Sequence, residues 1–197
     1  MKNVADSISG QAAVTGIGET AYTRGSHRSA LALLLDASLQ AIADAGLSPK
    51  DIDGVIPYAL GPVAEEIMTN LGLPDVRYSA QTPMGGASAV AALQTAALAI
   101  HAGVCNHVLL AIGRRGYSDS RIATRLSAMP QFRLVGEHEN PIGAIAPAQL
   151  YAPMARRHMQ LYGTTSQQFA EVAVTMREHA LLNDNAIMKK TLSTEDH

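Results

Sequence analysis

Residues 87–101, ASAVAALQTAALAIH, contain no charged side chain. Alanine and leucine dominate the stretch, which predicts a helix from about Gly86 to His101. Its few polar side chains are scattered around the helix instead of forming one solvent-facing stripe, and a helix that is apolar all round is buried all round. A single sheet covers only one side of such a helix. The other side therefore needs a second layer, supplied by another helix, a second sheet or another chain.

The composition also indicates an additional covered surface. Hydrophobic residues make up 47% of the 197 residues and charged residues only 16%, which is little charge for a small independent domain and favours a protein partner. A net charge of −2 argues against a nucleic-acid-binding protein. With one cysteine and no secretory signal, we expect a reducing, cytoplasmic location. No apolar run reaches the roughly 18 residues that a membrane span requires.

Extended segments alternate with helices in the first part of the chain. This alternation predicts an α/β fold with a mainly parallel sheet and a buried central helix. We expect strands at four places: 12–18, 52–56, 78–82 and 107–113. The first helix begins after Ser29 and is expected to carry one apolar face of Leu31, Leu34, Leu35, Leu39 and Ile42. A shorter helix is expected between Pro62 and Gly72.

The pattern changes after Gly113, and we divide the chain there into an α/β part, 1–113, and a second part, 114–197. Residues 114–146 lack a clear period and predict a long loop or a loosely structured subdomain. Two helices are expected after it, at 147–162 and 166–182, the second opened by a capping box of Thr165 and Gln168. The last seven residues, TLSTEDH, resemble the beginning of a further helix.

The turn before the uncharged helix is the main candidate site. Gly85 and Gly86 would let a ligand approach the backbone, and the unpaired N–H groups of a first helical turn could bind an acyl carbonyl or an oxyanion. The alternative is that the glycines only permit a sharp turn into a crowded core. Ser88 is interpreted as a local hydrogen-bonding residue rather than a nucleophile, because no histidine is recognisable as its base.

Several separated segments together resemble the thiolase superfamily, in particular its sterol-carrier and lipid-transfer-protein type of acetyl-CoA acetyltransferase-like proteins. They are AVTGIGETAYT, AGLSPKDIDGVI, the small-residue helix at 86–103, CNHVLLAIG and ARRHMQLYGTTSQQFAEVAV. The resemblance implies half of a duplicated five-layer fold followed by helices of its loop domain. The histidine and second cysteine motifs of the family's C-terminal half do not occur in this sequence.

The resemblance also sharpens the interpretation of the glycine turn. Thiolases place a nucleophilic cysteine two residues before a serine at the start of the buried helix, and Gly86 occupies that position when the serine is aligned with Ser88. The usual acyl-enzyme cannot form on glycine. Thiolase-like aldolases that act on steroid side-chain CoA thioesters also lack this cysteine and work with a partner protein. The resemblance therefore implies substrate binding by Gly85, Gly86, Ala87 and Ser88 without a confident catalytic residue.

Further candidates lie in the second part of the chain. His158 and Tyr162 are four residues apart and share one helix face, so they are either an acyl-chain contact or a structural pair. Arginines suit the phosphates of coenzyme A, although surface arginines are common. Those proposed here are Arg114, Arg115, Arg121 and Arg125. Coenzyme A is expected as part of the substrate, with no tightly bound cofactor and no metal.

Three other features favour structural roles. Cys105 lies at the entrance of an apolar strand and is interpreted as a buried structural residue. The triplet Glu137–Glu139 has no partner set with metal-ligand spacing and is interpreted as a solvated loop. The segment 16–21, GIGETA, matches a dinucleotide-binding pattern, but no helix follows it at once, which weakens that interpretation.

The resemblance to the thiolase superfamily implies an acyl-CoA-binding protein of lipid, steroid or fatty-acid metabolism that makes or breaks carbon–carbon bonds as a thiolase or a retro-aldolase. The alternative is a non-catalytic lipid-transfer or scaffold subunit that acts with a second protein. Because the family pairs the extended segment before its buried helix across a twofold axis, we expect a homodimer through residues 78–82.

Overall fold

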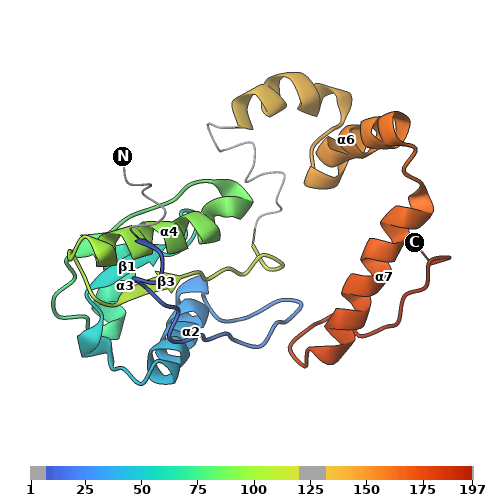
Figure 1. Cartoon of the computed structure of the whole chain (residues 1–197). Coiled ribbons are helices and arrows are strands. Elements are labelled where there is room, and N and C mark those ends of the chain that lie inside the picture. Colours follow the sequence, from blue (N-terminus) through green and yellow to red (C-terminus); the bar gives the residue numbers. More distant parts are fainter. Residues whose placement is uncertain (1–7, 120–131, 197) are drawn as a thin grey trace. The chain divides into compact units, whose positions relative to one another are not determined.

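The computed structural model describes residues 8–119 and 132–196, and they form two compact units (Figure 1). Unit 1 consists of residues 8–20 and Ser26–Arg115. Unit 2 consists of Ala21–Gly25 and the described residues from Gly116 onward. No pattern in the sequence predicted that the short segment Ala21–Gly25 belongs to unit 2.

Unit 1 is built on a parallel sheet of three strands in the order β2-β1-β3. The strands are β1 (Gly54–Pro57), β2 (Tyr78–Ser79) and β3 (Val108–Ala111). β1 pairs with β3 along its whole length, so that Gly54 lies opposite Val108 and Pro57 opposite Ala111. The predicted α/β class and parallel sheet are confirmed.

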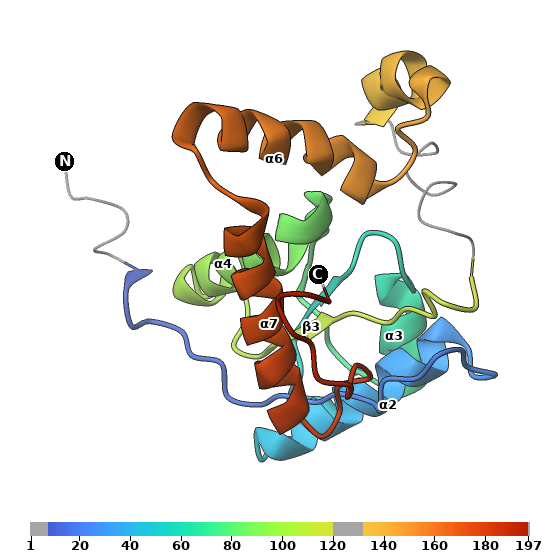
Figure 2. The ribbon, with the colours of Figure 1, turned by 90° about the vertical axis from the view of Figure 1, so that its right-hand side faces the viewer.

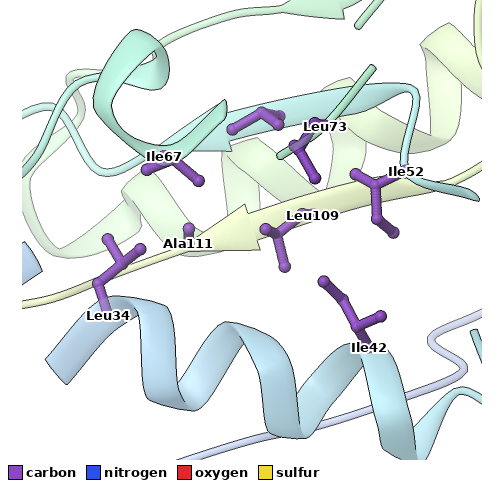
Figure 3. Close-up of a cluster of buried hydrophobic side chains, with 8 residues drawn as sticks. Leu34, Ile42, Ile52, Ile67, Leu73, Leu109 and Ala111 are labelled. Carbon is purple, nitrogen blue, oxygen red and sulfur yellow. The ribbon is translucent and has the colours of Figure 1, made fainter. Parts of the chain in front are cut away.

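Two helices, α2 (Ala30–Asp44) and α3 (Ala64–Leu71), cover one face of this sheet. Figure 3 shows side chains of α2 and α3 meeting those of β3 in the main apolar core. The buried members of that core are Leu34, Ile42, Ile52, Val55, Ile67, Leu73, Leu109 and Ala111. Burial of these apolar side chains stabilises the packing of α2 and α3 on the sheet, at whose strand ends the candidate site lies.

The predicted start of α2 is confirmed, since the Ser29 Oγ accepts a hydrogen bond from the Ala32 N–H at 3.0 Å. The predicted apolar face is wrong at one position. Leu39 is 47% exposed, while Ser38 is buried in its place. Leu39 is five residues from Leu34, and five residues turn a helix by about 140° away from the buried stripe.

Helix α4 (Ser88–His101) covers the opposite face of the sheet from α2 (Figure 2). Ala92 and Ala96 pack with Ile56 of β1 in a second apolar cluster. The other side of α4 is exposed, with Val90 at 70%. The predicted burial is therefore confirmed only for the side that faces the sheet, and within the described residues of unit 1 this sheet is the one layer that packs against α4.

The two sides of α4 are expected to respond differently to substitution. Ala96→Leu adds volume against Ile56 and should lower the free energy of unfolding by about 1–3 kcal/mol. Val90→Lys, on the exposed side, should change it by less than about 0.5 kcal/mol. Urea unfolding followed by circular dichroism measures both values. A loss above about 1 kcal/mol for Val90→Lys would show that this side is covered in solution.

The strand predicted at 12–18 is absent. The segment has no ladder partner among the described residues, and it runs along α2 instead. The Ile17 N–H donates to the Asp44 Oδ2 at 2.9 Å. A Cβ on Gly18 would meet the Ala37 carbonyl oxygen at 2.1 Å, and one on Gly16 would meet the Ala41 oxygen at 2.2 Å. The two glycines of GIGETA thus permit close packing on α2, which is a structural role.

Gly18→Ala is expected to lower the free energy of unfolding by about 1–3 kcal/mol, because the new methyl group meets helix backbone that cannot move aside locally. The matched control is Gly116→Ala, where a Cβ meets nothing within 4 Å. Chemical denaturation compares the two variants. Equal stability of both would mean that residues 16–18 do not pack on α2 in solution.

Unit 2 contains two long helices, α6 (Pro147–Tyr162) and α7 (Ser166–Leu182), at the predicted positions. The predicted capping box is confirmed: the Gln168 N–H donates to the Thr165 Oγ1 at 3.3 Å, and the Thr165 N–H donates to the Gln168 Oε1 at 2.9 Å. Short helical turns precede them, a π-helical turn at Val135–Glu139 and a 3-10 turn at Asn140–Ile142. The loop predicted at 114–146 is therefore partly helical.

Candidate functional site

The glycine turn before α4 is fixed by its own polar groups. The Thr82 Oγ1 donates to the Ser88 carbonyl oxygen at 2.9 Å, and the Ser88 Oγ accepts from the Met84 N–H at 3.0 Å. Ser88 is only 3% exposed. Its hydroxyl oxygen therefore holds the turn, in line with the local role predicted for it.

The two glycines of this turn differ in what they permit. Gly85 has a φ of +59°, in the left-handed region that favours glycine. Gly86 has no such constraint, and a Cβ added to it would meet no atom within 4 Å. Both residues are exposed. The space at position 86 is therefore open to a ligand, and the alternative of a turn crowded by core atoms does not fit this position.

Two backbone N–H groups of the turn donate hydrogen bonds within it, and the two N–H groups before them are candidates for binding a ligand. The Ala87 N–H donates to the Met84 carbonyl oxygen at 3.2 Å, and the Ser88 N–H donates to the Gly85 oxygen. The amides of Gly85 and Gly86 precede them, at the end of α4 where the helix dipole adds partial positive charge. These two N–H groups are the candidates for binding a carbonyl oxygen or an oxyanion.

Arg114 lies at the end of unit 1, three residues after β3. Its Cζ is 6.0 Å from the centre of the Tyr58 ring, within cation–π range. Arg115 is half-buried and has an interaction partner. Arg121 and Arg125, the other predicted coenzyme A ligands, lie outside the described residues. Sequence reasoning missed Tyr58, although its place directly after a strand was a usable signal.

The predicted pair His158 and Tyr162 lies on α6 in unit 2. Their ring centroids are 4.8 Å apart, and the His158 centroid is 6.4 Å from that of Phe169 on α7. Tyr162 is 71% exposed. The contacts show an aromatic group that joins the end of α6 to the start of α7, and an acyl-chain contact remains a prediction.

Cys105 is buried, at 2% exposure, as predicted. Burial raises the pKa of its thiol, and the nearby Asp53 carboxylate raises it further. A thiol that resists ionisation is a poor nucleophile. Cys105 therefore does not replace the cysteine that Gly86 lacks.

Residues 8–119 and 132–196 contain neither a candidate metal site nor a candidate membrane span. No group of three or more histidine, cysteine, aspartate or glutamate side chains in this part of the chain could hold a metal ion. Within the same residues, no helix is long and apolar enough to cross a membrane. In the predicted triplet Glu137–Glu139, the Glu137 carboxylate instead accepts from the Arg133 Nε at 2.6 Å.

The arrangement of unit 1, a parallel sheet between α2 and α4 with a glycine turn at the start of α4, defines a thiolase-like α/β fold. A solved SCP2-thiolase-like protein from Mycobacterium smegmatis has this fold, with a TM-score of 0.63 and 19% identity over 92% of this chain and 37% of its own. No family model matches the chain.

The relatives with higher identity are a lyase and two aldolases. The chain is 36% identical to a 17-hydroxy-3-oxo-4-pregnene-20-carboxyl-CoA lyase from Mycobacterium tuberculosis, over 96% of this chain and 51% of the relative. It is 34% identical to a steroid side-chain-cleaving aldolase from Thermomonospora curvata, over 96% and 50%. A solved Ltp2-ChsH2(DUF35) aldolase matches with a TM-score of 0.85 and 33% identity, over 94% and 47%. The chain spans about half the length of the curated relatives it matches.

Proposed function

We propose that this chain forms the thioester-binding part of a CoA-thioester lyase that cleaves a carbon–carbon bond by a retro-aldol reaction. The observation that carries this proposal is the similarity to the lyase and the aldolase, combined with Gly86 at the position of the thiolase nucleophile. A retro-aldol reaction needs no acyl-enzyme, so the missing cysteine fits it better than it fits thiolysis.

In this reaction the bond between the second and third carbons of a 3-hydroxyacyl thioester breaks. The hydroxyl proton goes to a base, the third carbon becomes a carbonyl, and the electron pair of the broken bond moves to the thioester as an enolate. The N–H groups of Gly85 and Gly86 are proposed to stabilise the enolate oxygen, because both residues are exposed in the turn before α4. The second carbon then takes up a proton. Residues 81–88 contain no ionisable side chain that could take up the hydroxyl proton, so the base belongs to another part of the assembled enzyme.

Coenzyme A is proposed as the carrier of the acyl group, with its phosphates bound by arginines of the set predicted from sequence. Isothermal titration of the full chain with butyryl-CoA tests this step directly. Binding in the micromolar to millimolar range supports the proposal. Heat changes no larger than those of buffer alone, at 1 mM ligand or more, would contradict it.

The alternative role, a non-catalytic subunit, is favoured by the match to the solved Ltp2-ChsH2(DUF35) aldolase, whose name joins two proteins. Retro-aldol cleavage of a 3-hydroxyacyl-CoA, assayed with the full chain alone and with a DUF35-type protein added, separates the two roles. Cleavage by the chain alone would rule out the passive role. A dependence on the added protein would support joint action.

We also propose that the chain forms a homodimer through 78–82. Among residues 8–119 and 132–196, β2 lies at one end of the strand order, so its outer edge has no ladder partner there and could pair with a second copy. Light scattering of the purified chain is expected to give a mass of about twice 20.7 kDa. A concentration-independent mass near 20.7 kDa would contradict this pairing.

A further inference from the structure

Tyr58 and Arg114 lie at the same edge of the sheet in unit 1, the one formed by the carboxyl ends of its strands. Tyr58 directly follows β1, and Arg114 comes three residues after β3, the neighbouring strand. Both therefore lie beyond the carboxyl ends of parallel strands, which is where ligands bind in open α/β sheets. The glycine turn follows β2 and lies beyond the same edge.

The two side chains also share a face of the sheet. Successive residues of a strand point to opposite faces. Ile56 packs against α4, so Tyr58, two residues later, points to the α4 side. After β3, a Cβ on Gly113 would meet Leu34 of α2, so Arg114 points the other way, toward α4. The 6.0 Å contact between the Arg114 guanidinium and the Tyr58 ring agrees with this alternation.

The start of α4 lies at the level of this pair. α4 connects two parallel strands, so it runs back along the sheet in the opposite direction. Ala92 packs with Ile56, and Ser88 is one turn earlier, about 6 Å further along the helix axis. A strand rises about 3.3 Å per residue, so this shift places Ser88 level with Tyr58. The glycine turn and the Tyr58–Arg114 pair therefore occupy one corner of unit 1.

This position conflicts with the role predicted for Arg114 at the phosphates of coenzyme A. The arm between the CoA sulfur and its first phosphate is 13 bonds long, or roughly 15 Å when extended. Packed layers of secondary structure lie about 8–10 Å apart, and a side chain as long as arginine can extend across most of that gap from the sheet toward α4. With the thioester at the glycine turn, Arg114 reaches the acyl group more readily than the phosphates.

We propose that Arg114, held over the Tyr58 ring, binds an oxygen on the third carbon of the acyl group. This inference rests on the proposed binding of a CoA thioester at the glycine turn. Arginine has only donors, so it recognises an acceptor such as a hydroxyl or carbonyl oxygen. Tyr58 is a positioning residue, because its ring holds the guanidinium in place. The pair selects oxygen-substituted acyl chains over plain ones.

The test is isothermal titration of the full chain with three ligands: 3-hydroxybutyryl-CoA, butyryl-CoA and coenzyme A. The wild-type chain is expected to bind the hydroxyacyl ligand about tenfold more tightly than butyryl-CoA. Arg114→Gln removes the charge from an exposed side chain and should erase this preference. Its affinity for coenzyme A should stay within about twofold of the wild-type value.

Substitutions at Tyr58 distinguish positioning from a general structural effect. Tyr58→Phe keeps the ring and should keep the preference, while Tyr58→Leu should reduce it about threefold. The matched control for Arg114→Gln is Arg77→Gln, since Arg77 pairs with Asp75 just before β2, at the opposite edge of the sheet. Arg77→Gln should leave all three affinities unchanged.

Two results would overturn the role of Arg114: equal binding of both acyl ligands by the wild-type chain, or an equal loss of affinity for all three ligands in Arg114→Gln. The second result would return Arg114 to the CoA phosphates. Failure of the wild-type chain to bind any of the three ligands would instead contradict the proposed function itself.

Discussion

Gly86→Cys is expected to create a reactive thiol at the start of α4. A Cβ at this position meets no atom within 4 Å, so the substitution should fold normally. A thiol at a helix N-terminus has a pKa below its ordinary value of about 8.5, which raises its thiolate fraction at pH 7 about tenfold for each unit. Cys105 reacts only when the core opens, so the new thiol should be alkylated at least about 100-fold faster.

Iodoacetamide labelling followed by peptide mass spectrometry reports on both thiols in one sample. The rate of labelling against pH gives the pKa of the introduced thiol. Gly116→Cys is the matched control, because position 116 is also open but lies in a loop outside any helix. Labelling at position 86 no faster than at position 116 would contradict the proposed donor geometry of the turn.

The same variant probes the relation to thiolases. Incubation of Gly86→Cys with acetyl-CoA is expected to leave an acetyl group on the new thiol, detected as a mass increase, because the thiolate attacks the thioester carbonyl and coenzyme A leaves. The wild-type chain has no nucleophile there. A modified Cys105 with an unmodified position 86 would place the thioester elsewhere.

Local signals in the sequence predicted most of the elements of this fold. Ser29, Thr165 and Gly72 mark helix ends that the structure places at those residues, because caps satisfy backbone groups within a few residues of themselves. The segment 12–18 shows the limit of such signals. Its composition suits a strand, but a strand exists only where a partner strand is available, and here its glycines pack on α2.

The candidate site was predicted in part. The glycine turn was recognisable because glycine and a helix start are local features, whereas the role of the Ser88 hydroxyl depends on the Met84 amide and became visible only in three dimensions. Tyr58 and Arg114 are 56 positions apart in sequence and meet because β1 pairs with β3. No local pattern encodes that pairing.

The exposed side of α4 connects the sequence pattern to the comparisons. An uncharged helix predicts cover on both sides, and Val90 and Leu93 are nevertheless exposed. The matched lyase and aldolase are about twice as long as this chain, so the other half of each relative offers material for a second layer. An exposed apolar helix side of this kind is typical of a surface that packs against further polypeptide.

Asp53 joins the amino ends of the three strands, and its replacement is expected to have the largest effect on stability. Its Oδ1 accepts from the His107 N–H at 2.8 Å, and its Oδ2 accepts from the N–H and the side-chain amide of Asn106 at 2.9 and 3.1 Å. Its carbonyl oxygen accepts from the Arg77 and Tyr78 amides before β2. Asp53→Asn turns an acceptor oxygen into a donor that faces these N–H groups, and should cost about 2–3 kcal/mol.

The pH dependence provides a second measure of the same carboxylate. Burial acts to raise the pKa of Asp53, but the hydrogen bonds from His107 and Asn106 outweigh it and leave the pKa below its ordinary value. A carboxyl group with a lowered pKa in the folded state stabilises the fold above its unfolded pKa, near 3.9, and this contribution is lost as the pH falls through that value toward the folded one. Asp36 and Asp51 also have lowered pKa values, so several carboxyl groups contribute to the stability that the wild-type chain loses at low pH. Urea unfolding between pH 7 and pH 3 should show a smaller decrease in the free energy of unfolding for Asp53→Asn than for wild type. If the free energies of the two proteins fell in parallel with pH, Asp53 would not be an ionised acceptor between the strands.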